Sequence, residues 1–198
     1  IEPQLIELQA FPSLFAYQKE YEDILRKNFP ILNDFDVKIS KHEYIDLLNK
    51  VIVGDEKPEN VVLLEIFPEQ QKTAIDFVFT EQYLGVKTIC LTKVKKEGKQ
   101  LYYENEGKKI PIKRIYNRVI FDELQNYPDL KLEFDFKEEV DVEWITHPNW
   151  FFKISKYILP KLEHQYIPKS YFLNEIPANL NLSEYVLKPL FSFAGSGV

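Results

Sequence analysis

The clearest hydrophobic pattern lies in the middle of the chain, where two apolar runs flank a longer segment. Residues 61–67 read Val-Val-Leu-Leu-Glu-Ile-Phe, a β-rich run typical of a strand buried on both faces. A helix is expected over about 69–84, ended by Gly85 at a position that favours a left-handed residue. Residues 86–91 are a second apolar run. This strand, helix, strand order predicts a βαβ unit within a parallel sheet.

The N-terminal segment alternates apolar and polar residues before it becomes helical. Residues 4–10 predict a strand with Ile6, Leu8 and Ala10 on one face and Leu5, Glu7 and Gln9 on the other. Ser13 is a suitable N-cap for a helix over about 14–27.

A second helix is expected after Ser40, because Glu43 stands three residues later and completes a capping box. Its apolar stripe is formed by Tyr44, Leu47, Leu48 and Val51. The polar residues 54–60 mark the first boundary along the chain.

The second half of the chain predicts shorter elements. Charged residues 93–109 indicate a hairpin that turns at 97–99, followed by strands at 113–119 and 141–148. Asn149 can begin a helix that continues to Pro160, which a helix interior does not tolerate. Residues 185–190 predict a last strand that leads into a turn at 195–197.

Composition restricts the class of protein. The hydrophobic fraction is 45% and the net charge is −6, with charges of both signs scattered along the chain. Such a chain is globular, and nucleic acid is a poor first guess for its partner. Without a long apolar run or a signal peptide, the sequence predicts a cytoplasmic protein that binds no membrane. Its single cysteine, Cys90, is expected to be a buried reduced thiol. The ends of the sequence suggest an internal piece of a longer polypeptide.

The C-terminal residues are the strongest candidate for chemistry. Lys188 precedes a small-residue loop that contains Gly195, Ser196 and Gly197. Backbone amides in such a loop can surround a phosphate while an ammonium group balances its charge. The loop matches neither the Walker A pattern nor the dinucleotide pattern. The alternative interpretation is a flexible hairpin tip or chain end.

Two further sets of residues are candidates. Arg118 is the candidate catalytic residue, expected to face a cleft at the end of its strand and to meet an anionic group of the substrate, although a surface ion pair with Asp122 or Glu123 is the alternative. Glu7 and Gln9 could offer oxygen ligands to Mg²⁺, although a solvated strand face is the alternative. The histidines show no metal-ligand spacing.

Three segments, in this order, resemble the circularly permuted ATP-grasp proteins of the glutathionylspermidine synthase type. Residues 3–10 resemble the "LLEYNAD" stretch of that family, residues 112–119 resemble its "VDVIYRRV" strand, and residues 186–198 resemble its "KP…GxxG" phosphate loop. The resemblance touches the beginning, middle and end of the chain.

The resemblance implies an ATP- and Mg²⁺-dependent ligase that activates a small-molecule or peptide carboxylate as an acyl phosphate, which an amine then attacks. Glu7 and Gln9 would ligate Mg²⁺, and Lys156, Lys188 and residues 195–197 would contact ATP. The central βαβ segment would be a pre-ATP-grasp domain that helps to bind the acceptor substrate.

The sequence therefore predicts an α/β fold. A Rossmann-like pre-ATP-grasp parallel sheet with flanking helices would be joined to parts of a circularly permuted ATP-grasp fold. The expected segments are 1–55 with the metal ligands, 56–147 with the sheet, and 148–198 as the start of a truncated nucleotide-binding lobe. Two rival hypotheses are a non-catalytic nucleotide-binding or scaffold protein and a domain that binds a small acidic metabolite through Arg118 without a nucleotide.

Overall fold

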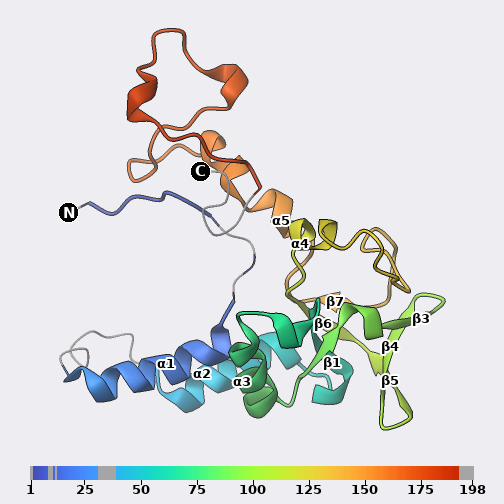
Figure 1. Cartoon of the computed structure of the whole chain (residues 1–198). Coiled ribbons are helices and arrows are strands. Elements are labelled where there is room, and N and C mark those ends of the chain that lie inside the picture. The colour runs from blue at the N-terminus through green and yellow to red at the C-terminus, as the bar shows by residue number, and fades with distance from the viewer. Residues whose placement is uncertain (1, 9–10, 12, 31–38, 192–198) are drawn as a thin grey trace. The chain divides into compact units, whose positions relative to one another are not determined.

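The computed structural model describes residues 2–8, 11, 13–30 and 39–191 (Figure 1). The chain forms two compact units. The larger unit comprises residues 12–119 and 123–148, and the smaller comprises 1–11, 120–122 and 149–198. The predicted 1–55 segment is therefore divided, since residues 12–55 belong to the same unit as the sheet.

The larger unit is built on a four-stranded parallel sheet in the order β2-β1-β6-β7. Its strands are β1 (Val61–Glu65), β2 (Lys87–Cys90), β6 (Arg114–Asn117) and β7 (Glu143–Trp144). Helix α3 (Ala74–Leu84) connects β1 to β2 and ends at Gly85, whose φ of 68° suits the left-handed conformation of a helix C-terminus. The predicted βαβ unit is confirmed.

Three helices cover one face of this sheet: α1 (Phe15–Asn28), α2 (Lys41–Leu48) and α3 (Figure 1). They pack on the side chains that β1 and β6 direct to this face, among them Val61, Leu63 and Tyr116. All five residues of β1 are buried, as its uninterrupted apolar sequence predicts. The sheet is thus covered as an α/β fold requires.

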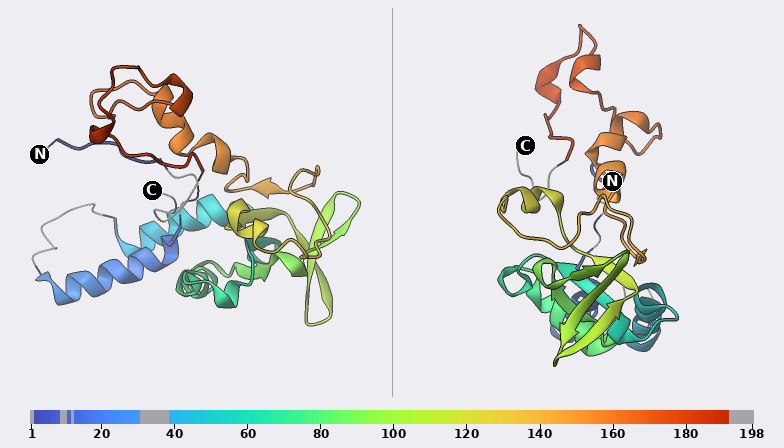
Figure 2. Two further views of the ribbon diagram at one scale, coloured as in Figure 1. Left: turned by 45° about the horizontal axis from the view of Figure 1, so that its top comes forward. Right: turned by 90° about the vertical axis from the view of Figure 1, so that its right-hand side faces the viewer.

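The opposite face of the sheet packs against a small antiparallel sheet of β3 (Lys95–Glu97), β4 (Gln100–Asn105) and β5 (Lys108–Ile112). These strands face the viewer in the right-hand part of Figure 2. The hairpin predicted over 93–109 is confirmed, and β5 extends it by one further strand. Leu101, Tyr103 and Ile112 carry the contact with the core.

The helix starts test two predictions about capping. The Ser40 capping box is present, with Glu43 N donating to Ser40 Oγ at 3.2 Å and Ser40 N donating to Glu43 Oε2 at 2.9 Å. The prediction for Ser13 is wrong, because Leu14 is the N-cap residue of α1 and provides no side-chain cap.

The predicted apolar stripe of α2 is wrong in part. Leu48 is buried, whereas Leu47 and Val51 are exposed, because the side that faces the core is formed by Ile45, Leu48 and Ile52.

The smaller unit contains short helical turns joined by extended segments. Its aromatic cluster is centred on Phe11 and Phe151, with Phe121 and Phe191 packed against them. The predicted helix over 149–160 is interrupted, since α5 (Trp150–Lys153) ends before a 3-10 helix at Lys156–Lys161 that contains Pro160. The remaining turns of the described chain are η2 (Asn49–Val53), η3 (Pro58–Asn60), η4 (Pro68–Gln70), η5 (Leu91–Lys93), α4 (Phe121–Gln125), η7 (Leu173–Glu175) and η8 (Leu182–Glu184).

Two predicted strands of the smaller unit are wrong. Residues 4–8 and 185–190 have no partner strand within the described chain and form no β-structure. Ile6, expected to anchor its strand in the core, is 66% exposed. An alternating pattern favours a strand only where a neighbouring strand satisfies its backbone. Residues 9 and 10 lie outside the described part.

None of the described helices is both long enough and apolar enough to cross a bilayer.

Candidate functional site

The carboxyl edge of the parallel sheet gathers polar residues at the ends of β1 and β6. Glu65 ends β1, Asn117 ends β6, and Arg118 follows it. In the strand order β2-β1-β6-β7, the connection from β1 leads to β2 at one edge of the sheet, and the connection from β6 leads to β7 at the opposite edge. The point between β1 and β6 is therefore a topological switch point, where open α/β sheets bind their ligands.

Glu65 is a buried carboxyl group at this edge, with 3% of the residue exposed. Its Oε1 accepts a hydrogen bond of 2.9 Å from the backbone N–H of Ile66. Burial raises the pKa of Glu65 to about 7, although this amide and the Arg118 charge act in the opposite direction. A carboxyl group of this kind can hold or release a proton near neutral pH.

Glu123 adds a second carboxylate to this edge. Its Oε1 accepts a hydrogen bond of 2.6 Å from Gln71 Nε2, which also donates to the backbone oxygen of Ile66 at 2.8 Å. The charge of Glu123 contributes to the raised pKa of Glu65. Gln71 thus holds Glu123 against the end of β1.

Arg118 lies inside the larger unit, with 6% of the residue exposed. Its backbone N–H donates to Leu64 O at 2.9 Å and extends the pairing of β6 with β1. Its positive charge lowers the pKa values of both Glu65 and Asp76, although burial of each carboxyl group outweighs it. Arg118 is therefore a buried cation, not a surface residue, and its charge favours the ionised forms of the two buried carboxyl groups.

Asp76, in the first turn of α3, is almost completely buried and caps another helix. Its Oδ1 accepts a hydrogen bond of 2.9 Å from the backbone N–H of Tyr17, in the first turn of α1. Burial raises the pKa of Asp76, and this amide opposes the rise. The carboxylate therefore supplies the cap that Leu14 lacks.

Asp76 Oδ2 and the Tyr116 hydroxyl are buried and have no hydrogen-bond partner among the described residues. Burial raises the pKa of Tyr116, and the Asp76 charge contributes to the rise. Sequence reasoning missed Glu65, Asp76 and Tyr116. A signal for Glu65 was present, because it is the one charged residue within an otherwise apolar run.

The smaller unit brings together three of the residues predicted to bind ATP and Mg²⁺. Lys156 Nζ lies 3.1 Å from Glu7 Oε1, and Lys188 Nζ donates to the backbone oxygen of Ile6 at 3.3 Å. The backbone of the same segment is held by Leu5 N, which donates to Tyr166 O at 2.7 Å. Two lysines from distant parts of the sequence therefore converge on residues 6 and 7.

The two side chains of the Lys156–Glu7 ion pair differ in their exposure to solvent. The Lys156 side chain is 6% exposed, whereas the Glu7 side chain is 40% exposed. Glu7 therefore neutralises a buried ammonium group and still presents its carboxylate to solvent. Gln9, Gly195, Ser196 and Gly197 lie outside the described residues, so the full predicted ligand set is not in view.

The described residues contain no group of three or more His, Cys, Asp or Glu side chains arranged to hold a metal ion. Cys90 is a free thiol but is half-buried, not buried as predicted, and its Sγ lies 3.1 Å from Thr92 Oγ1. The expected burial fails because β2 lies at the edge of the sheet.

Comparison with known proteins found no family model and no curated protein that matches this chain.

Proposed function

We propose that the protein is an ATP- and Mg²⁺-dependent carboxylate–amine ligase that acts through an acyl phosphate. The observation that carries the proposal is the convergence of Glu7, Lys156 and Lys188 on one short segment of the smaller unit. The resemblance of the sequence to permuted ATP-grasp proteins assigns these three residues to the nucleotide and metal site. Their proximity supports that assignment because Lys188 and the residue it contacts, Ile6, are 182 positions apart in the sequence.

The residue types suit magnesium and nucleotide. Mg²⁺ in nucleotide sites is commonly held by one or two carboxylates together with phosphate oxygens, and Glu7 offers one half-exposed carboxylate. The ammonium groups of Lys156 and Lys188 can make charge-assisted contacts with phosphate. Bound ATP would supply the phosphoryl group that activates a carboxylate.

The protein's own residues would position and neutralise the reactants. Lys188 holds an ammonium group beside residue 6 and can shift from the Ile6 carbonyl to an anionic ligand, because that contact is long and exposed. Lys156 is fixed by burial and keeps its charge compensated by Glu7. Lys156 thus provides a fixed cation and Lys188 an adjustable one.

Calorimetric titration with ATP and Mg²⁺ tests the nucleotide site. Lys188→Ala should weaken ATP binding by about tenfold, corresponding to loss of about 1.4 kcal/mol from a charge-assisted contact. Lys169→Ala is the matched control, since Lys169 is another exposed lysine of the same unit. Unchanged affinity in a folded Lys188→Ala protein would remove the assignment.

Hydroxylamine tests the ligase chemistry without knowledge of the natural amine. It attacks an acyl phosphate to release phosphate and leave a hydroxamate, which a colour reaction with ferric ion detects. A panel of small-molecule and peptide carboxylates should yield hydroxamate with the wild-type protein and none with Glu7→Gln, because the transferring phosphoryl group depends on the cation. ATP binding without Mg²⁺ should survive in Glu7→Gln.

The second candidate function is a non-catalytic nucleotide-binding or scaffold protein. The observation in its favour is the ion pair itself, which commits the Glu7 carboxylate to Lys156. The two functions differ in one outcome of the same experiments: a scaffold would bind ATP through Lys188 and form no hydroxamate with any carboxylate.

A further inference from the structure

Strand β2 lies at one edge of the parallel sheet. In the part of the chain that the structure describes, it has a strand neighbour on one side alone, β1. Alternate backbone N–H and C=O groups of β2 therefore point away from the sheet, where another extended chain could pair with them. All four residues of β2 are partly exposed, in contrast with the fully buried β1.

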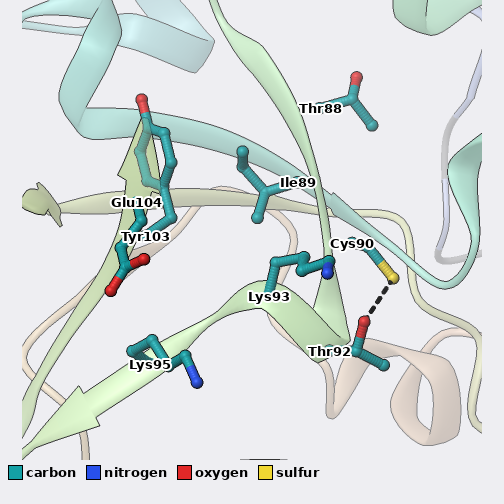
Figure 3. Close-up of a pocket in the computed structure, with 8 residues that line it drawn as sticks. All are labelled: Thr88, Ile89, Cys90, Thr92, Lys93, Lys95, Tyr103 and Glu104. Atoms are coloured by element: carbon teal, nitrogen blue, oxygen red, sulfur yellow. Dashed lines mark hydrogen bonds between the residues drawn. The ribbon is translucent and has the colours of Figure 1, made fainter. Parts of the chain in front are cut away.

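An open cavity of about 540 Å³ runs along this edge (Figure 3). Strand β2 contributes three of its lining residues, and the rest come from η5, β3 and β4. They are Thr88, Ile89, Cys90, Thr92, Lys93, Lys95, Tyr103 and Glu104. In Figure 3, Ile89 points towards Tyr103, whereas Cys90 points to the other side of the strand. A chain placed beside β2 would therefore meet side chains on both of its faces.

The charge of the cavity differs from that of the protein. The whole chain carries a net charge of −6, yet the cavity is lined by Lys93 and Lys95 against the one acid Glu104. Lys93 makes no ion pair with any described residue, and the partner of Lys95 is Glu133, at 3.4 Å on the exposed surface. Exposed pairs of this kind contribute little and can be exchanged for another partner.

We propose that this edge binds an extended acidic peptide, which adds to β2 as a fifth strand of the parallel sheet. The backbone of β2 would supply the hydrogen bonds, Ile89 and Tyr103 the apolar contact, and Lys93 and Lys95 the preference for acidic side chains. This peptide site is independent of the proposed nucleotide site, which is formed by residues of the smaller unit.

Cys90 allows the test to report on this position. It is the single cysteine of the chain and lines the cavity, so the rate at which iodoacetamide alkylates it measures occupancy of the edge. The probe is a ten-residue peptide of alternating valine and aspartate, blocked at both ends. Saturating peptide should slow alkylation of the intact protein by about tenfold, because an added strand lies about 4.8 Å from β2. The same peptide with alternate backbone nitrogens methylated should give no protection.

Charge variants complete the test. The double substitution Lys93→Glu with Lys95→Glu should weaken peptide binding by more than about tenfold, whereas Lys50→Glu, an exposed lysine on η2, should not. Circular dichroism checks that each variant is folded. The proposal is overturned if an alternating valine–lysine peptide binds equally well, if Cys90 is not protected, or if no binding is detected at millimolar peptide.

Discussion

The two units of this protein are stabilised by different means. In the larger unit, every residue of β1 is buried, and each face of the sheet is covered by other elements. In the smaller unit, the described residues form short helical turns, and apolar side chains such as Leu173 and Leu187 are each 71% exposed. Aromatic contacts around Phe151 provide its core. Apolar residues are therefore buried by strand pairing and packing in the larger unit, whereas many apolar residues of the smaller unit, which has no paired strands among its described residues, stay exposed.

Truncation of apolar side chains should give the largest contrast between the units. Leu63→Ala removes a fully buried side chain of β1 and should lower the free energy of unfolding by about 2 to 5 kcal/mol. Leu182→Ala, at a residue that is 61% exposed in the smaller unit, should change it by less than about 0.5 kcal/mol. Urea unfolding followed by circular dichroism measures both. Similar losses for the two variants would show that the smaller unit buries Leu182 in solution.

The pH dependence of stability should single out the carboxyl edge of the larger unit. Burial raises the pKa of Glu65 from 4.5 to about 7, so between these values the folded protein holds a proton that the unfolded chain has released. The stabilisation is complete below about pH 4.5 and is lost as the pH rises through 7, by at most about 3 kcal/mol. Asp76, whose pKa is also raised, changes stability in the same direction.

Glu65→Gln tests this dependence because the amide is neutral at every pH. Between pH 5 and pH 8 the wild-type protein should lose about 2 kcal/mol more stability than this variant. Urea midpoints at the two pH values provide the measurement. Parallel losses would mean that Glu65 is already ionised at pH 5, with Arg118 and the Ile66 amide outweighing burial.

The two helix starts of the larger unit should give the smallest contrast. Ser40→Ala removes the capping box of α2 and should cost about 1 kcal/mol. Ser13→Ala should cost clearly less, because Leu14 and not Ser13 is the N-cap residue of α1. Thermal unfolding of the two variants side by side checks the order, and a larger effect at Ser13 would contradict this description of α1.

Sequence patterns predicted the elements whose partners lie nearby in the chain. The run at 61–67, the helix ended by Gly85 and the hairpin at 93–109 each carry their own signals of period or turn, and all are found. The strand at 185–190 could not be judged in this way. Its apolar residues match a strand, but whether they form one depends on a partner strand that no local pattern reveals.

The residues of the candidate site could be suggested from local sequence, but their contacts with one another could not. A motif suggested Glu7, Lys156 and Lys188 one at a time, but not that Glu7 and Lys156 form an ion pair. Asp76 carries no sequence signal, because an aspartate in the first turn of a helix is expected to favour its own helix. Its role as the cap of α1 depends on tertiary contact alone.

The contact between Asp76 and Tyr17 also bears on how the larger unit folds. It joins residues 59 positions apart, so α1 receives its cap only after the chain has closed a long loop onto α3. Loop closure over this length costs roughly 3 to 4 kcal/mol of chain entropy in its length-dependent part. We therefore expect α1 to form late, after α3 has docked on β1 and β2, and a peptide spanning α1 alone to remain mostly unstructured in water.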